Sequence, residues 1–218
     1  MPGVPSCADI IADAVAHLGP RLAHVTAAEN LPHIRKHGLW PAAELARRAG
    51  IDPGSILLRR DRVRVGTARL NHQRPFLTGM KAAQVRLTDH SVEAWAAQLD
   101  ERVFFFPACK RAAFHGSFEL ATDVLWLDTA KLLAVAFDRI DLCALNSGSF
   151  RQIPADPART RYDRDLSIYR PLSQGIAAFR SHRRDTGRKQ GLDDVKEVSL
   201  RSGLDAETLN TLICDPPS

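Results

Sequence analysis

The segment from Leu22 to Leu39 constrains the fold more than any other part of the chain, because it joins a short strand to a short helix. Leu22–Val25 is apolar except for His24, which is typical of a strand that carries one polar residue. Thr26 follows the strand and can cap a helix that begins within the next few residues. The sequence therefore predicts a strand that ends beside a helix N-terminus, with a histidine at the junction.

The helix after this strand is short and has an apolar face. Leu31 and Ile34 are three residues apart, which places them on one side of a helix. Gly38 supplies the residue that commonly ends a helix, so Leu39 can return to the core. A histidine at such a strand end could donate a hydrogen bond to a ribose hydroxyl, and the backbone beside it could pair with the amide of a planar ring. Without further evidence, a lone histidine beside an apolar strand is more often a polar residue near the core.

Length and composition favour one folded domain over residues 1–218. The chain is 44% hydrophobic and has no long polar linker, so it can bury one sizeable core. No apolar stretch approaches the roughly 18 to 20 residues needed to cross a bilayer, and the N-terminus lacks the features of a signal peptide. We therefore expect a cytoplasmic protein without a membrane partner. Within the domain we expect an N-terminal helix in residues 1–20 and a basic loop or helix insertion at residues 151–190.

The four cysteines give no sign of a metal site or of a disulfide framework. They are Cys7, Cys109, Cys143 and Cys214, and the sequence has no Cys-x-x-Cys pair and no histidine at zinc-ligand spacing. We expect scattered, reduced thiols and no metal. Cys109 alone has neighbours that suggest an electropositive setting, and a turn after a strand explains its position equally well.

Positive charge is concentrated in two segments. Residues 59–86 hold eight basic residues and one acidic residue, and residues 151–190 hold ten basic and four acidic residues, although the whole chain has a net charge of only +5. Such segments attract polyanions through counterion release and can hold a pyrophosphate. Arginine-rich surfaces also occur in proteins whose composition favours arginine over lysine, but the segregation of charge favours binding.

The remaining pattern is that of an α+β fold with helices mainly in the N-terminal half. Helices are expected where apolar residues recur at helical spacing, and strands where short apolar runs lie between polar residues. Residues 55–70 alternate charged and apolar residues and fit a half-exposed strand or an extended arm. The expected helices are residues 8–18, 41–49 and 91–99 and one that begins at 128–129, and the expected strands are residues 103–106, 124–127 and 140–145.

The pattern His-x-Thr-x-x-x-Asn-Leu-x-x-Ile-x-x-x-Gly-Leu, which begins at His24, resembles the opening of the DarT-type ADP-ribosyltransferases, which modify bases in DNA. Two later segments follow in the order of that superfamily. Arg102–Pro107 resembles its aromatic strand, and Val195–Leu200 resembles the late strand that carries its catalytic glutamate. The resemblance implies an ADP-ribosyltransferase-like split pair of small β-sheets. The whole chain also resembles a family of uncharacterised bacterial proteins that share Arg-Val-Phe-Phe, Asp-Val-Leu-x-Leu-Asp-Thr and Asn-Ser-Gly segments.

This resemblance implies that the protein transfers ADP-ribose from NAD, used as a co-substrate, to an acceptor that we expect to be DNA or RNA. It gives the catalytic role to Glu197, whose strand-like run would place Ser199 on the same face. The carboxylate would stabilise an oxocarbenium-like transition state and orient or deprotonate the acceptor. The residues expected to bind NAD are His24, Val25 and Thr26, an aromatic residue among Phe104, Phe105 and Phe106, and an arginine such as Arg62 or Arg74.

Two details of the expected site differ from the family pattern or are left open by it. The stacking residue of the family is usually a tyrosine, whereas the matching strand here has only phenylalanines, so stacking remains and a hydroxyl contact is lost. Arg59 and Arg64 are further candidates for the pyrophosphate. The polar turn Asn146–Ser149, followed by Arg151, is another place where an anion could bind, and a plain β-turn explains it as readily.

Two other functions stay open. The same scaffold could transfer an RNA 2′-phosphate to NAD, which needs several arginines around a phosphate and does not need Glu197. A degenerate scaffold could also bind nucleic acid without catalysis. The sequence has no Gly-x-Gly-x-x-Gly motif and no Walker loop, which argues against a Rossmann oxidoreductase or a kinase. Whether the protein is a toxin with an antitoxin partner is not decided by the sequence.

Overall fold

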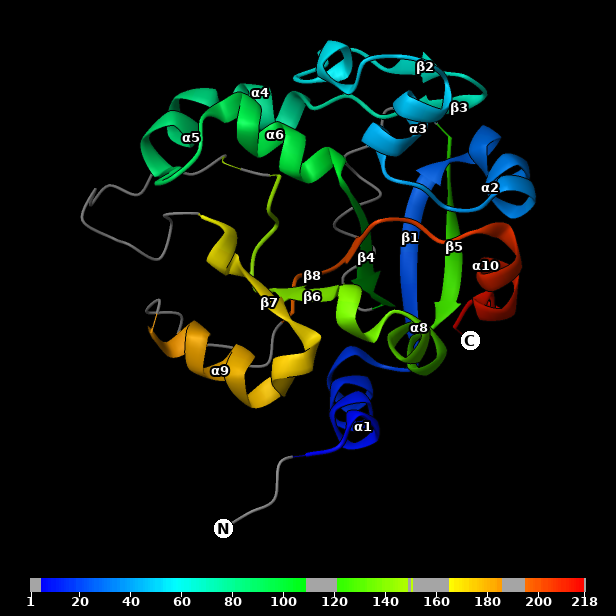
Figure 1. The fold of residues 1–218 in the computed structure, drawn as a ribbon, viewed down its shortest axis with the longest axis vertical. Helices are drawn as coiled ribbons and strands as arrows, with labels where there is room; N and C mark the ends of the chain where they lie inside the picture. The colour runs from blue at the N-terminus through cyan, green and yellow to red at the C-terminus, as the bar shows by residue number, and fades with distance from the viewer. Residues whose placement is uncertain (1–4, 109–120, 149, 151–164, 186–194, 218) are drawn as a thin grey trace.

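The computed structural model describes residues 5–108, 121–148, 150, 165–185 and 195–217. The main element is a six-stranded antiparallel sheet with the strand order β5-β1-β4-β8-β6-β7, and a separate hairpin joins β2 to β3 (Figure 1). This arrangement confirms the α+β class expected from the sequence. The finer expectation, an ADP-ribosyltransferase-like split pair of small sheets, stays a prediction.

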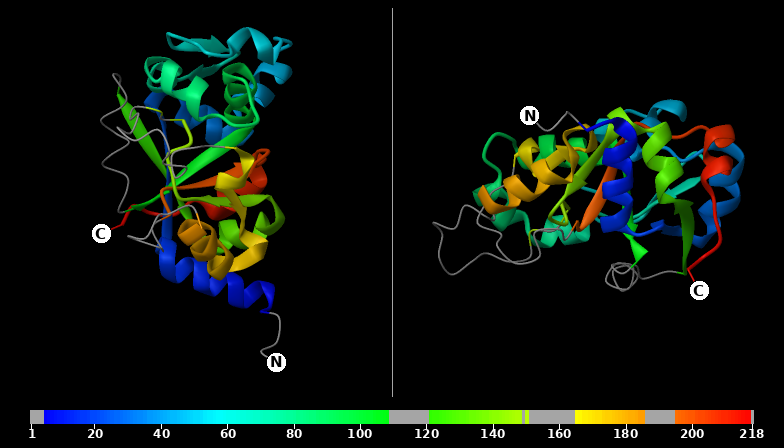
Figure 2. Two further views of the ribbon diagram at one scale, coloured as in Figure 1. Left: turned by 90° about the vertical axis from the view of Figure 1, so that its left-hand side faces the viewer. Right: turned by 90° about the horizontal axis from the view of Figure 1, so that it is seen from below.

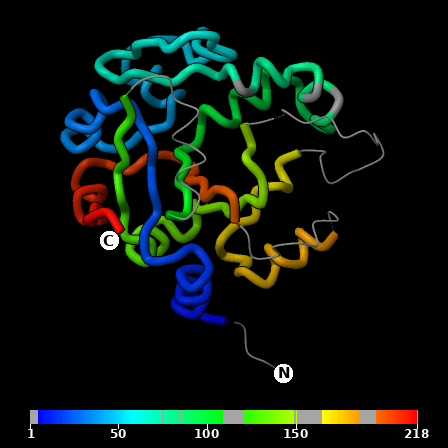
Figure 3. Tube along the Cα trace, turned by 180° about the vertical axis from the view of Figure 1, so that it is seen from behind, coloured from blue at the N-terminus to red at the C-terminus, as the bar shows by residue number. Residues whose placement is uncertain are grey.

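The strands lie close to the positions predicted from the apolar runs. β1 and β5 lie side by side at one edge of the sheet (Figure 3). The strand predicted at residues 140–145 ends two residues earlier than expected. The strands of the sheet are β1 (Arg21–Ala27), β4 (Arg102–Pro107), β5 (Thr122–Asp128), β6 (Ile140–Cys143), β7 (Tyr169–Pro171) and β8 (Glu197–Arg201), and the hairpin consists of β2 (Val63–Val65) and β3 (Ala68–Leu70).

Helices cover both faces of the sheet. The larger core lies on one face, under α1 (Cys7–Leu18), α8 (Thr129–Val135), α9 (Gly175–Asp185) and α10 (Ala206–Leu212). A smaller core lies on the other face, under α4 (Arg74–Thr78), α5 (Met80–Arg86) and α6 (Val92–Asp100), which Figure 1 shows together. α2 (Leu31–His37) and α3 (Ala42–Arg48) follow β1, and short 3₁₀ helices span Ala28–Asn30, Pro53–Ile56, Phe137–Arg139, Leu166–Ile168 and Leu172–Gln174. The hairpin and α1 lie at opposite ends of the molecule (Figure 2).

Side-chain caps explain where several of these helices begin. Ser6 and Asp9 form a capping box at the start of α1, and Ser91 accepts a hydrogen bond from a first-turn amide of α6. Asp128 caps α8 in the same way. The predicted cap by Thr26 is wrong, because α2 begins after Asn30 and has no side-chain cap.

Gly38 ends α2, as predicted, and allows two segments of chain to approach closely. Its φ is +95°, and a Cβ atom at this position would lie only 2.3 Å from the carbonyl oxygen of Leu204. Leu39 and Leu204 then exchange two backbone hydrogen bonds of 2.8 Å. A larger residue at position 38 would therefore break the contact that fixes the chain between α2 and α3.

β1 and β4 separate soon after they meet. Only two residue pairs join them, the second being Ala23 with Phe106, whereas β1 pairs with β5 over seven residues and β4 with β8 over four. His24 lies where the two strands part, and its Nδ1 is 3.0 Å from the carbonyl oxygen of Phe104. A side chain thus takes the place of strand pairing, and the two strands leave space between them.

Residues 55–70, predicted as one strand or arm, include the β2–β3 hairpin instead. Gly66, with a φ of +57°, lies at its turn. Asn30 fastens the hairpin to the rest of the molecule, since its side-chain amide donates to the hydroxyl of Thr26 at 3.0 Å and to the carbonyl oxygen of Arg69 at 2.9 Å. The Asn30 side-chain oxygen accepts from the N–H of Arg69 at 2.8 Å. Three hydrogen bonds from one buried amide therefore set the position of β3 relative to β1.

Some predictions fall on other parts of the chain. Cys109, Ser149, Arg151 and much of the insertion expected at residues 151–190 lie outside the described residues, whereas residues 165–185 of that insertion contain β7 and α9. Within the described ranges, no helix is both long enough and apolar enough to cross a membrane.

Candidate functional site

A cavity of about 320 Å³ lies where β1 and β4 part. This volume is at the lower end of the range of roughly 300–1,000 Å³ that is usual for small-molecule sites. The cavity wall comes from β1, β4, the first residue of β8, the chain around α2 and α3, β3, the end of α6, and the turn at residues 146–148. Elements from most of the chain therefore meet at this one place.

His24 lines the cavity with one ring nitrogen already engaged. A carbonyl oxygen can only accept, so Nδ1 carries the proton that it donates to Phe104, and Nε2 of the neutral ring is left as an acceptor. Burial lowers the pKa of His24, and the hydrogen bond to Phe104 opposes this effect only in part, so the ring is neutral at pH 7. A neutral His24 would accept a hydrogen bond from a ribose hydroxyl, which reverses the donor role expected from the sequence.

Val25 and Thr26 line the same cavity from the next two positions of β1. Both are buried, and the Thr26 hydroxyl is held by the side chain of Asn30, which is also a wall residue. The three residues expected at this strand end therefore lie together.

Two of the three phenylalanines of β4 face the cavity. Phe104 and Phe106 line it, whereas Phe105 is fully buried in the larger core on the other face of the sheet. This separation follows from the alternation of side chains along a strand. Phe105 is thus a core residue, and the stacking role expected of this strand falls to its two neighbours.

Glu197 lines the cavity as the first residue of β8, although only 2% of its surface is exposed. The alternation predicted for this strand is confirmed, because Val198 and Leu200 belong to the larger core and Ser199 accepts a hydrogen bond from Arg102 on the other face. β8 lies between β4 and β6. Glu197 is therefore a buried residue of a central strand.

A backbone amide holds the carboxylate of Glu197. The N–H of Ser147 lies 3.3 Å from both carboxylate oxygens and donates to them. The carbonyl oxygen of Ser147 accepts in turn from the indole N–H of Trp95 at 3.2 Å. The turn that the sequence analysis considered as an anion site thus directs its Ser147 amide to a glutamate of the protein.

Tyr169 lies next to this carboxylate and keeps its proton. Burial raises the pKa of Tyr169 well above its usual value, and the negative charge of Glu197 adds to the increase. The ring of Tyr169 stacks on Trp95, with centroids 6.2 Å apart, and the guanidinium of Arg102 lies 3.9 Å from its centre. Arg102 is itself neutralised by Asp141, with 2.6 Å between Nη1 and Oδ2. The floor of the site is therefore a rigid, closely paired network.

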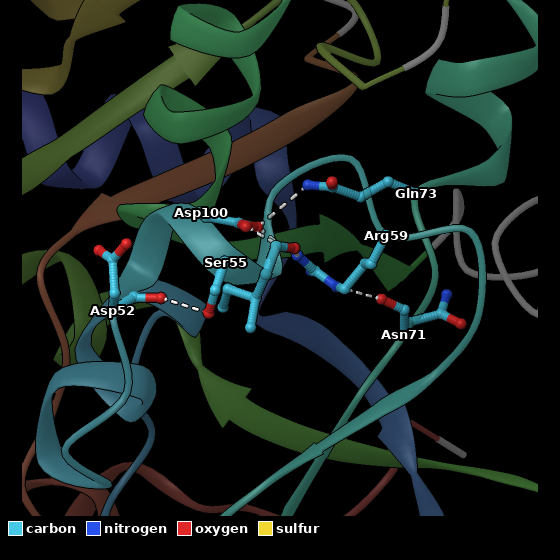
Figure 4. Close-up of polar contacts among 7 residues, drawn as sticks. Asp52, Ser55, Arg59, Asn71, Gln73 and Asp100 are labelled. Carbon is cyan, nitrogen blue, oxygen red and sulfur yellow. Dashed lines mark hydrogen bonds and ion pairs between the residues drawn. The ribbon is translucent and has the colours of Figure 1, made fainter.

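Arg59 and Arg62 are the two wall residues among the four arginines considered for the pyrophosphate. Arg59 forms a buried ion pair with Asp100, with 2.7 Å between Nη1 and Oδ2 (Figure 4). Burial raises the pKa of Asp100, while the charge of Arg59 acts in the opposite direction. Arg62 has a buried Nη2 with no hydrogen-bond partner among the described residues. Arg62 is thus the arginine best placed to contact a phosphate.

The other two arginines lie outside the cavity wall and are paired with acids. Arg64 lies 2.9 Å from Glu29, and Arg74 lies 3.0 Å from Asp61. Glu29 and Asp100 come from outside residues 59–86 and neutralise two arginines of that segment. The folded protein therefore presents less positive charge there than the sequence suggests. No three His, Cys, Asp or Glu side chains are grouped to hold a metal ion in the part of the chain that the structure describes.

Some residues of the site depend on contacts between distant segments and were not predicted. Asn30 belongs to the quoted pattern, yet its contact with Arg69 depends on a hairpin that the sequence did not indicate. Trp95 does not line the cavity but supports the wall residue Ser147 from behind. Asn71 and Gln73 lie in the cavity wall just after β3, and the available signal was two polar residues at alternate positions beside an apolar strand.

Residues 20–208 match the model of one protein family, which is described as "Family of unknown function (DUF7002)". The comparisons with curated proteins and with solved structures found no match. The matched span begins just before β1 and ends within α10, so it contains every wall residue of the cavity.

Proposed function

The chain belongs to the DUF7002 family, whose description gives no function, and we propose that it is an NAD-dependent ADP-ribosyltransferase that acts on nucleic acid. The observation that carries the proposal is that His24, from the start of the chain, and Glu197, from its end, line one cavity together with Phe104 and Phe106. The opening between β1 and β4 also supports an ADP-ribosyltransferase-like fold, whose two sheets would meet at the few residue pairs that join these strands.

The wall residues suit the parts of NAD. Phe104 and Phe106 offer ring surfaces for nicotinamide. Nε2 of the neutral His24 can accept a hydrogen bond from a ribose hydroxyl, and Nη2 of Arg62 can donate to the pyrophosphate. Each of these groups therefore has a matching partner in the dinucleotide.

The reaction breaks the bond between nicotinamide and C1′ of the ribose and forms a bond between C1′ and a nucleophilic atom of the acceptor. Nicotinamide leaves with the bonding electron pair, so positive charge develops on the sugar. The carboxylate of Glu197 stabilises that charge and accepts the proton that the acceptor loses. The N–H of Ser147 fixes both oxygens of this carboxylate, which limits the reorganisation that the reaction requires.

The arginines favour this reaction over transfer of an RNA 2′-phosphate to NAD. That alternative needs several free guanidinium groups around one phosphate. Arg59 is paired with Asp100, Arg69 with Glu29 and Arg102 with Asp141, which leaves Arg62 as the wall arginine without an ion pair among the described residues. A nucleic acid acceptor is supported by the resemblance of the His24 segment to the DarT-type enzymes and by the exposed Arg60 and Lys81 in the basic segment.

Incubation of the protein with labelled NAD and separate pools of DNA, RNA and protein tests the proposal. We expect label on nucleic acid and release of nicotinamide, and we expect both to be lost in Glu197→Gln. Glu207→Gln is the matched control, because Glu207 is exposed on α10 and is not a wall residue. Full turnover by Glu197→Gln would favour the phosphotransferase instead.

Thermal unfolding separates an enzyme from a non-catalytic nucleic acid binder. NAD at a hundred times its dissociation constant should raise the free energy of unfolding by about 2.7 kcal/mol. Salt-sensitive binding of DNA or RNA, combined with no effect of NAD on unfolding, would contradict the proposal.

A further inference from the structure

We propose that Asn71 and Gln73 form a subsite that recognises a nucleobase carrying an exocyclic amino group. The side-chain oxygens of these two residues would accept hydrogen bonds from that group. The subsite lies in the same cavity as His24 and Glu197. The subsite rests on the function proposed above only in one respect, which is whether NAD or the acceptor strand supplies the base.

The first observation is a cluster of polar atoms without partners. The side-chain oxygens of Asn71 and Gln73 and Nη2 of Arg62 are all buried, and none has a hydrogen-bond partner among the described residues. All three residues line the cavity. Nε of Arg69, another wall residue, is a fourth buried atom without a hydrogen-bond partner among the described residues. A buried polar group without a partner destabilises a protein, so a group of them in one cavity wall points to groups that a ligand completes.

The second observation fixes the chemical role of Gln73. Its side-chain nitrogen donates to Oδ1 of Asp100 at 3.2 Å, and the opposite orientation of the amide would place its oxygen against a carboxylate. Figure 4 shows the nitrogen of this amide directed at Asp100. The oxygen of Gln73 can therefore act only as an acceptor toward a ligand, which excludes the two-bond amide contact that reads both edges of adenine.

The third observation is that this part of the wall is rigid. Nε of Arg59 donates to the backbone carbonyl of Asn71 at 2.6 Å, and the N–H of Gln73 donates to the backbone carbonyl of Arg59 at 2.8 Å. Arg59 is held in turn by Asp100. The Asn71 side chain points away from this ion pair (Figure 4). The backbone that carries the two acceptors is thus fixed by contacts that a ligand does not have to break.

The surroundings suit a flat, apolar ring with a polar edge. Leu45, Leu70 and Leu99 line the same cavity and provide apolar surface. Two acceptors in such a wall favour a ring edge that carries hydrogen-bond donors, and Arg62 adds a donor for an acceptor atom of the same nucleotide. Adenine, cytosine and guanine combine these features, and either the adenine of NAD or a base of the acceptor strand could supply the group.

The test compares ligands that differ in one amino group. AMP and purine riboside monophosphate have the same ring and phosphate, but only AMP has the exocyclic amine. We expect calorimetric titration of the wild-type protein to show about tenfold tighter binding of AMP, which corresponds to about 1.4 kcal/mol. CMP and its analogue without the amino group form a second pair, and GMP and IMP form a third. Equal affinities within all three pairs, or no binding of any of the six ligands, would overturn the proposal.

Variants then locate the discrimination. Asn71→Leu and Gln73→Met remove one acceptor each with little change of shape. We expect them to bind AMP as weakly as the purine analogue, whose own affinity should stay unchanged. Asn210→Leu is the control, because Asn210 is exposed on α10 and is not a wall residue. Retained preference for AMP in both folded variants would also overturn the proposal, and the wild-type comparison decides the matter if a variant does not fold.

A last pair of measurements identifies the source of the base and separates the two proposals. If the adenine of NAD occupies the subsite, Asn71→Leu weakens binding of NAD more than binding of nicotinamide hypoxanthine dinucleotide. If an acceptor base occupies it, NAD binding is unchanged and modification of oligonucleotides with adenine, cytosine or guanine falls. AMP discrimination without any release of nicotinamide would leave the subsite standing and refute the transferase. Transfer of ADP-ribose without any preference for AMP over the purine analogue would support the transferase and refute the subsite.

Discussion

His24 is held as a neutral imidazole, which has a consequence for stability. Its folded-state pKa is lowered by burial, whereas an unfolded histidine has a pKa near 6.5. Between those two values the unfolded chain binds the proton more readily, so the free energy of unfolding falls as the pH drops below about 6.5. We expect the loss of stability between about pH 7.5 and about pH 5.5 to be smaller in His24→Asn, as measured by urea unfolding. If the free energy of unfolding depends on pH equally in the wild type and in His24→Asn, the neutral state assigned to His24 is contradicted.

Trp95 positions the carboxylate of Glu197 through one backbone amide. Trp95→Phe keeps an aromatic ring but removes the N–H that donates to Ser147, so the turn that holds Glu197 loosens. We expect kcat for nicotinamide release to fall about tenfold, equivalent to about 1.4 kcal/mol of barrier, while the dissociation constant of NAD stays unchanged.

Trp126→Phe is the control for this prediction. Trp126 is buried in β5, outside the cavity wall, so the substitution removes the same volume without touching the turn. A similar drop in kcat in both variants would show that Trp95 acts only through general stability.

At the scale of elements, the hairpin depends on one asparagine. Asn30→Ala removes three hydrogen bonds between β1 and β3 and leaves the Arg69 amide and carbonyl without those partners. We expect a loss of about 1–3 kcal/mol of stability per unsatisfied buried group and faster amide exchange in β2 and β3 than in β1. Asn210→Ala removes one exposed hydrogen bond, to the carbonyl of Arg35 in α2, and should cost less stability and leave exchange in the hairpin unchanged. Unchanged exchange in the hairpin would show that other contacts hold it.

Elements that depend on local chemistry were predictable from the sequence. Gly38 ends α2 and Ser91 begins α6 because a glycine with positive φ and a serine cap act on adjacent residues. Short apolar runs likewise marked β4 and β5. The hairpin was missed because its pairing depends on a turn at Gly66, whose sequence resembles that of an extended arm.

At the scale of the whole molecule, the two faces of the sheet differ in role: one packs into the larger core, and the other carries cavity-wall residues. Phe105 belongs to the larger core and Phe104 to the cavity wall, although they are neighbours in β4. We expect Phe105→Ala to lower the free energy of unfolding by about 3–5 kcal/mol. Phe104→Ala should cost less stability but weaken NAD binding, as measured by urea unfolding and by NAD titration. A larger stability loss for Phe104→Ala, with NAD affinity intact, would contradict this division.

The meeting of the site residues could be predicted only in part. The resemblance of short motifs brought His24 and Glu197 into one expected site, and the structure places both in one cavity wall. The environment of Glu197 could not be predicted, because Ser147 and Trp95 reach it through the packing of α6 against the sheet. The pairing of Arg59 with Asp100 was equally hidden, since it joins charges from segments that the sequence gives no reason to bring together.

The early parting of β1 from β4 leaves strand edges in the interior of the protein. On an outer surface, such edges invite pairing with other chains and lead to aggregation. Here they border a half-open pocket lined by Val25 and Phe104, so the backbone of both strands faces a space of the size that a small molecule fills. A ligand in that space could form hydrogen bonds with main-chain groups where a neighbouring strand would otherwise lie.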